Sequence, residues 1–162
     1  MLSGAGYTVR RMAPVPDPSL VGISHDYADS VAVDLEVPDA RSPEYWARTA
    51  LEQAPCIVRG LIRVAQARVL RLRLRPRTDT DAVLGWPIAS STQDTLHLRA
   101  TGHLLRADIV VRRVSGLRFI TTTSLFYKRR SASTLWMFVG PLHRCIKPYL
   151  LGRAAAALTA SS

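Results

Sequence analysis

Apolar and polar residues alternate in several short segments of the chain, and this alternation predicts β-strands. From Ser30 to Val37 every second residue is apolar, which places these residues on one face of an extended segment. The same period of two marks four later segments, which are separated by turn-forming residues: 85–90, 95–100, 103–113 and 117–128. Because short turns join antiparallel neighbours, the last four strands are expected to form a meander.

Two stretches between these strands are predicted to be helices. Ser42-Pro43-Glu44 is a helix start, because serine caps free amides, proline fits the first turn and glutamate favours the positive end of the helix dipole. This helix is expected to extend to about Gln53 and to stop at Pro55. A second helix is predicted from about Pro55 to Leu70, with apolar residues on one face and arginines opposite. Residues 71–76 fit either a frayed helix end or a short strand.

A long apolar helix is expected to close the chain. It is predicted to begin near Ser131 or Ser133 and to continue past Leu150. Pro141 and Pro148 lie within this segment, so we expect a kinked helix or two helical segments.

The order strand, helix, antiparallel strands, helix predicts a single α+β domain over residues 25–155. A curved antiparallel sheet is expected to pack around the C-terminal helix, and such an arrangement encloses a cavity that suits a ligand. Residues 1–24 contain glycines and alternating prolines, so they are expected to form a flexible leader without a strand. Residues 156–162 are expected to form a disordered tail.

Composition and charge restrict the function classes. The chain has 162 residues, of which 48% are hydrophobic and 21% are charged, so one globular core is expected. The formal charge of +10 comes almost entirely from arginine, and a positive field attracts nucleic acid, anionic lipid or an acidic small molecule. Aromatic residues make up only 7% and no base-stacking motif is present, which argues against nucleic acid. A membrane surface stays a candidate partner.

Cofactor and metal signatures are missing from the sequence. No P-loop, nucleophile elbow or dinucleotide fingerprint is present, so no cofactor is expected. His97 and His103 lack the spacing of a zinc site and are expected to face solvent, so no metal is predicted. Cys56 and Cys145 are expected to be small buried hydrophobes in a reducing compartment. Without a visible secretory signal, the expected location is the cytoplasm.

The neighbouring polar residues His143 and Arg144 are the strongest candidates for chemistry. Both have apolar neighbours on the closing helix, so one of them is expected to point towards the sheet. His143 is then a candidate acid or base, and Arg144 a candidate partner for a carboxylate or phosphate. The structural alternative has His143 bonded to a backbone carbonyl and Arg144 tying the helix to Asp26 or Asp29.

Aromatic residues supply the apolar candidates for ligand contact. We expect four of them to line the pocket: Trp86, Phe119, Trp136 and Phe138. A tryptophan in a strand also fits an ordinary core role. His25 and Tyr27 are candidates for the pocket mouth, although the same segment fits a turn in which Asp26 bonds nearby amides.

Several motifs form a set over residues 25–153: His25-Asp26-Tyr27-Ala28-Asp29, Ser42-Pro43-Glu44 with Trp46, Gly85-Trp86, Thr121-Thr122, and Trp136 through Pro141 to His143-Arg144. This set resembles an uncharacterised bacterial family, common in actinobacteria, that also occurs as a C-terminal appendage of short-chain-dehydrogenase-like NAD-binding proteins. That family is similar to the helix-grip superfamily of polyketide cyclases, START lipid-binding domains and plant-allergen-like proteins (SRPBCC). The resemblance implies an antiparallel sheet that grips a C-terminal helix around an apolar cavity. Fewer clear strands and the prolines of the last helix depart from the superfamily pattern.

Three functions follow as hypotheses. The first is a module that binds a hydrophobic or amphipathic small molecule between the sheet and the C-terminal helix. The second is a polyketide-cyclase-like or dehydratase-like enzyme that uses His143 for proton transfer. The third is a basic module that binds an acidic protein or a membrane surface.

Overall fold

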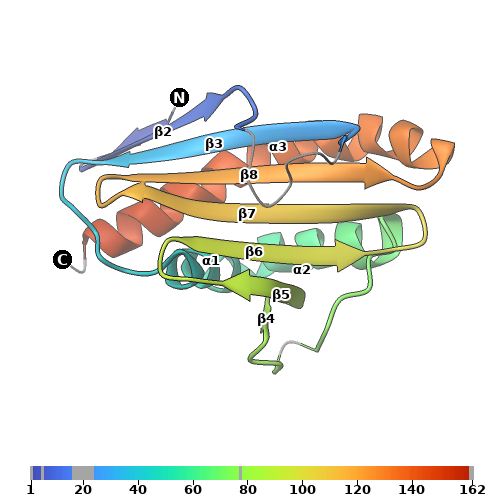
Figure 1. The fold of residues 1–162 in the computed structure, drawn as a ribbon, viewed down its shortest axis with the longest axis horizontal. Helices are drawn as coiled ribbons and strands as arrows, with labels where there is room; N and C mark the ends of the chain where they lie inside the picture. Colours follow the sequence, from blue (N-terminus) through green and yellow to red (C-terminus); the bar gives the residue numbers. More distant parts are fainter. Residues whose placement is uncertain (1, 5, 16–23, 77, 161–162) are drawn as a thin grey trace.

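The computed structural model describes residues 2–4, 6–15, 24–76 and 78–160, and its main element is an antiparallel sheet with helices on one face (Figure 1). The described strands follow each other across the sheet in the order β1-β2-β3-β8-β7-β6-β5-β4. Their bounds are β1 Leu2–Gly4, β2 Tyr7–Met12, β3 Tyr27–Leu35, β4 Ala82–Val83, β5 Trp86–Ser91, β6 Thr95–Thr101, β7 Leu105–Ser115 and β8 Arg118–Tyr127. The predicted α+β class and the meander of β5 to β8 are confirmed.

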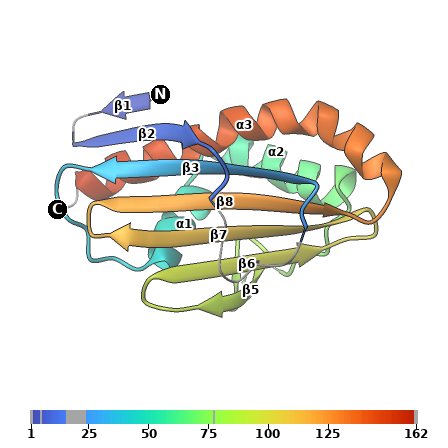
Figure 2. The same ribbon diagram turned by 45° about the horizontal axis from the view of Figure 1, so that its top comes forward.

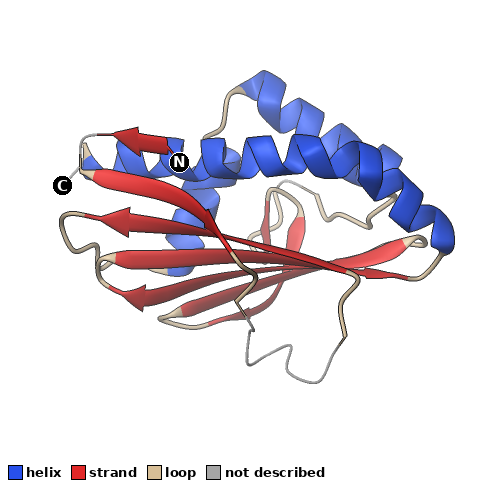
Figure 3. Ribbon diagram, turned by 90° about the horizontal axis from the view of Figure 1, so that it is seen from above, coloured by secondary structure: helices blue, strands red, loops and turns tan. Residues whose placement is uncertain are grey.

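The helices cover a single face of the sheet (Figures 2 and 3). Their bounds are α1 Pro43–Glu52, α2 Cys56–Val64, the π-helical turn η2 Ala65–Val69 and α3 Arg130–Thr159. At the start of α1 the hydroxyl of Ser42 accepts a hydrogen bond from the amide of Tyr45, as the sequence predicts. The second predicted helix is present as α2 followed by η2. None of the described helices has the length and apolar character needed to cross a bilayer.

The first part of the chain differs from its prediction, because β1 and β2 lie where a leader without strands was expected. All of β2 pairs with β3, from Tyr7 opposite Leu35 to Met12 opposite Ser30. Val9 in the middle of β2 is buried in the core. The prolines that argued against a strand follow β2, so they do not interrupt its pairing. Residues 16–23 of the expected leader lie outside the described residues.

The closing helix α3 is one helix of 30 residues rather than two segments (Figure 3). Pro141 and Pro148 lie inside it, although each removes one donor from the helix ladder. The expected disordered tail is helical as far as Thr159, and residues 161–162 are not described. Cys56 and Cys145 were expected to be buried but are both exposed and free, because they lie on the solvent faces of α2 and α3.

The segment between η2 and β4 is neither a helix end nor a full strand. Leu72 forms an isolated bridge with Gly102 and so attaches this segment to the sheet. The following strands β4 and β5 are joined by a tight turn in which Leu84 has φ 49° and Gly85 has φ 87°. This turn places Trp86 on the inner side of the sheet edge, where it is buried.

The turn provides a test of backbone strain. Replacing Gly85 with alanine is expected to destabilise the protein by about 1 to 3 kcal/mol, because alanine would have to adopt the positive φ of this position and its Cβ would lie 2.8 Å from the carbonyl oxygen of Arg75. Gly60→Ala in α2 is the matched control: its Cβ meets nothing within 4 Å, so a gain of about 0.5 to 1 kcal/mol is expected. Urea denaturation measures the free energy of unfolding of both variants. Equal changes in the two would contradict backbone strain at Gly85.

Candidate functional site

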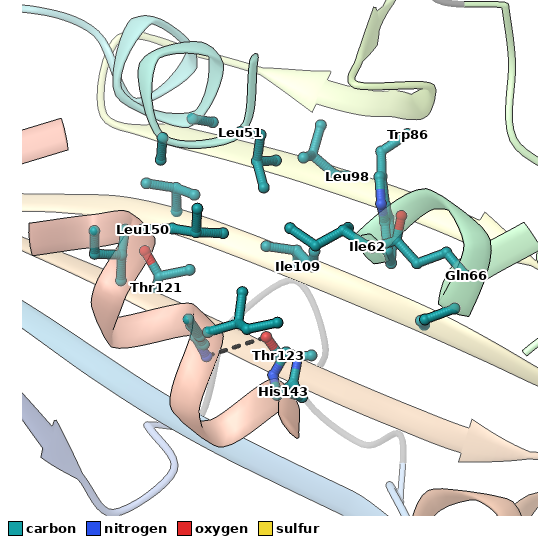
Figure 4. A pocket seen from close by; sticks show the side chains of 18 of the residues that line it. Leu51, Ile62, Gln66, Trp86, Leu98, Ile109, Thr121, Thr123, His143 and Leu150 are labelled. Carbon is teal, nitrogen blue, oxygen red and sulfur yellow. Dashed lines mark hydrogen bonds between the residues drawn. The ribbon is translucent and has the colours of Figure 1, made fainter. Parts of the chain in front are cut away.

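An apolar cavity of about 140 Å³ lies between the inner face of the sheet and the helices. Its walls come from α1, α2, η2 and α3 on one side and from β3 and β5 to β8 on the other, and most lining side chains are aliphatic or aromatic (Figure 4). An engineered protein cavity of about 150 Å³ binds benzene. The volume therefore suits a small apolar molecule.

The alternation of residues along β8 explains where the cavity forms. Phe119, Thr121, Thr123 and Leu125 all face the helices, with two short side chains between two large ones. At one end Phe119 stacks on Trp46 of α1, with ring centroids 4.6 Å apart. The short threonines in the middle leave space that the helices do not fill.

A buried polar cluster joins α3 to the sheet beside this space. The ammonium of Lys147 donates to the Asp29 carboxylate at 2.9 Å, to the Asp29 carbonyl at 3.2 Å and to the hydroxyl of Thr123 at 3.0 Å. Figure 4 draws the bond to Thr123 as a dashed line. These contacts use all three donors of the ammonium. One helical turn earlier, Nε2 of His143 lies 3.5 Å from the same carboxylate oxygen of Asp29.

The cluster shifts the pKa values of its members. Burial alone would raise the pKa of Asp29, but His143 and Lys147 outweigh it and lower this pKa to about 2. For Lys147 burial dominates and lowers the pKa to about 8, although Asp29 opposes the shift. At neutral pH Asp29 and Lys147 are therefore both ionised, and the carboxylate of Asp29 neutralises the ammonium of Lys147 on the cavity wall.

Three polar atoms of cavity-lining side chains are buried without a hydrogen-bond partner among the described residues: Trp86 Nε1, Gln66 Oε1 and His143 Nε2. Nε2 of His143 and the carboxylate oxygen of Asp29 are 3.5 Å apart, which is long for a hydrogen bond, and the two groups do not have hydrogen-bond geometry. Figure 4 draws Trp86 and Gln66 towards the α2 and η2 side of the cavity, whereas His143 lies near Thr123 at the α3 side. Buried polar groups without partners cost stability, so each of these atoms fits a polar group of a ligand.

The structure brings four of the predicted site residues to the cavity wall and leaves four away from it. Trp86, Phe119, Trp136 and His143 line the cavity. Tyr27 lies behind this wall, where its ring meets the edge of Trp136 at a centroid distance of 5.0 Å. Burial, with Asp29 nearby, raises the pKa of Tyr27 to about 12. The remaining three residues are exposed outside the cavity: His25, Phe138 and Arg144.

The helical period accounts for these exposed positions. Phe138 follows Trp136 by two residues, which is about 200° around the helix, so the two side chains point in nearly opposite directions. Arg144 follows His143 by one residue and turns away from the sheet by about 100°. The sequence analysis did not name Gln66, Thr123 or Lys147 as candidate site residues, and it gave Asp29 a role only as an anchor for Arg144. A signal was present, because Lys147 lies one turn after His143 and Asp29 lies two residues after Tyr27.

A second polar cluster lies on the outer face of the sheet. The carboxylate of Asp108 is fully buried and receives bonds from His97 at 2.6 Å, Arg99 at 2.7 Å and Arg106 at 2.9 Å. Burial would raise the pKa of Asp108, but the bonds from His97 and Arg99 hold it below its usual range. His97 is therefore buried and paired rather than facing solvent as predicted. Within the described ranges, no group of three or more His, Cys, Asp or Glu side chains is placed to hold a metal ion.

Comparisons with known proteins do not place the chain in a family. No family model matches it, and no curated protein matches it. Among solved structures, the crystal structure of CalU16 from Micromonospora echinospora overlaps with 94% of this chain and 97% of its own, at 12% identity and a TM-score of 0.32. An overlap at this TM-score does not establish a shared fold.

The ion pair of Asp29 and Lys147 generates a prediction for stability. Lys147→Met is expected to cost about 3 kcal/mol at pH 7, because the Asp29 carboxylate loses its cation. In the native protein Asp29 titrates near pH 2 rather than near 3.8. Its contribution to stability is therefore present above about pH 4 and is lost as the pH falls towards 2. Urea unfolding from pH 2 to 7 should show this loss in the native protein and a smaller loss in the variant.

The double variant Asp29→Asn/Lys147→Met is the control for this prediction. It removes both charges, so it should be more stable than Lys147→Met alone. Asp34 and Asp108 keep their own partners in all three proteins, so their contribution to the acid loss cancels in the comparison. A double variant that is no more stable than Lys147→Met would show that Lys147 acts through packing and not through the ion pair.

Proposed function

We propose that the protein binds a small, largely apolar and uncharged molecule in the cavity between the sheet and α3. The observation that carries this proposal is the set of three unpartnered polar atoms on an otherwise apolar wall. Pockets for small molecules have this character, with a few polar groups that orient the ligand. A ligand hydroxyl accepts from the Trp86 N–H and donates to the Gln66 carbonyl oxygen at the same end of the cavity.

The charges around the cavity favour a neutral ligand. In the part of the chain that the structure describes, no arginine borders the cavity, and Lys147 is already paired with Asp29. An anion beside His143 would also lie close to the carboxylate of Asp29. Burying a charge without a partner is costly, so a carboxylate ligand is disfavoured relative to its alcohol or ketone analogue.

The proposal includes the helix-grip class expected from the sequence. An antiparallel sheet that lies across a C-terminal helix, with an apolar cavity between them, supports this assignment. It also supports hydrophobic small-molecule binding over the surface-only alternative, because the cavity has a polar end as well as apolar walls.

A matched ligand pair tests the proposal. We expect 2-naphthol to raise the melting temperature and 2-naphthoate to have no effect, and native mass spectrometry of freshly purified protein should detect a co-purifying small molecule. Trp86→Phe keeps an aromatic ring but removes the indole N–H together with the five-membered ring, so the affinity for 2-naphthol should fall about fivefold to tenfold. Phe138→Ala is the control, since Phe138 lies outside the cavity and its variant should bind normally. Equal binding by the Trp86→Phe variant, or no binding by the native protein, would refute the proposal.

Proton transfer to the bound molecule is a second candidate function. It is favoured by the position of His143, whose imidazole lines the cavity beside the ionised Asp29. Replacing His143 with glutamine keeps a side-chain hydrogen-bonding group at the cavity wall, so the variant should still bind the co-purified molecule but lose its conversion, as followed by the mass of the product. Conversion at the native rate would remove His143 from any proton transfer.

A further inference from the structure

Two rows of exposed apolar side chains run along the helical face. The α2 stripe consists of Ile57, Leu61 and Val64, and the α3 stripe consists of Phe138, Leu142 and Tyr149. Their spacings of four, seven and eleven residues place the members of each stripe on one side of their helix. Ile57 and Phe138 are 81% and 76% exposed, so the native fold gives them almost no packing partner. Exposed apolar surface of this kind marks an interaction site.

The two stripes border the mouth of the cavity. Leu61 and Leu142 both line the cavity and are also 45% and 40% exposed to solvent. A side chain that contacts both the cavity and solvent lies at the opening. Because Leu61 belongs to α2 and Leu142 to α3, the opening lies between these two helices, on the face of the molecule that the helices cover (Figures 2 and 3).

The charge around the stripes is positive. Neither residues 54–78 nor residues 109–162 contain an aspartate or glutamate, so α2, η2 and α3 carry only basic charged side chains. Arg68 continues the α2 stripe and Arg153 continues the α3 stripe, and both are exposed. Among the described helices only α1 carries acidic residues, Glu44 and Glu52, and both are paired with Arg48. Asp29 of the sheet is paired with Lys147.

We propose that this face docks on an anionic lipid membrane, with the two apolar stripes inserted between lipid headgroups and the arginines on their phosphates. Peripheral membrane binding needs this combination of exposed apolar side chains and basic residues. A water-soluble anion would use the arginines but would leave Ile57 and Phe138 in water. Because the cavity opens on the same face, docking would let an apolar molecule pass between bilayer and cavity without crossing water.

Flotation with lipid vesicles tests the proposal without any cavity ligand, so its outcome is independent of the proposed small-molecule binding. The protein should bind vesicles of mixed phosphatidylcholine and phosphatidylglycerol, bind weakly to pure phosphatidylcholine, and dissociate as salt is raised. The double variant Ile57→Ser/Phe138→Ser should lose affinity for the anionic vesicles by about tenfold or more, because it removes inserted apolar area.

Val37→Ser/Val114→Ser is the matched control, since these valines are 62% and 54% exposed but lie outside the helices. This control should bind anionic vesicles like the native protein. Absence of vesicle binding, or equal binding by the two double variants, would overturn the proposal. Light scattering without vesicles provides a further check: a dimer that Ile57→Ser/Phe138→Ser dissociates would mean that a second copy covers this face, and the membrane proposal would be wrong.

Discussion

The attachment of α3 to the middle of the sheet depends on one buried ammonium. Lys147 reaches Asp29 on β3 and Thr123 on β8, which are neighbours across the strand pair. Burial of a lone ammonium is strongly unfavourable, so this contact forms only when the helix and both strands are in place. It thereby favours one position of α3 on the sheet, where purely apolar packing would tolerate several. Together with the apolar packing of α3 on β2 and β3, this contact sets the spacing between helix and sheet beside the cavity.

The cavity is a consequence of side-chain size along one strand. On β8 the large residues Phe119 and Leu125 stand at the ends of the inner row, and short threonines stand between them. α1 closes one end through the stacking of Trp46 on Phe119, α2 contributes Leu61 at the opening, and η2 contributes Gln66 to the wall. Interiors are normally packed without such space. The proposed ligand would fill this space and provide partners for the polar atoms on its wall.

Local patterns in the sequence predict local structure well and long-range contacts poorly. The start of α1 and the meander from β5 to β8 were predicted because caps, turns and alternation act over a few residues. β2 was missed because its partner β3 lies beyond the proline-containing segment, and pairing of distant strands leaves no short signal. The cluster of Asp29 and Lys147 joins positions 118 residues apart. Alternation along the strands correctly predicted that Trp86 and Phe119 lie on the cavity wall. The prediction for Phe138 was wrong, because positions two apart on a helix differ by about 200°, so Phe138 and Trp136 point in nearly opposite directions.

The described arginines lie outside the cavity and three unpartnered polar atoms lie on its wall, and this separation links the two proposals. Arg68 and Arg153 extend the two apolar stripes on the face where the cavity opens. Inside, the ammonium of Lys147 is neutralised by Asp29, and the indole N–H of Trp86 and the amide oxygen of Gln66 are a neutral donor and a neutral acceptor. A positive field at the mouth acts over about 10 Å at moderate salt, whereas hydrogen bonds in the cavity act at contact. Attraction to an anionic surface and selection of a neutral ligand can therefore operate in one domain without opposing each other.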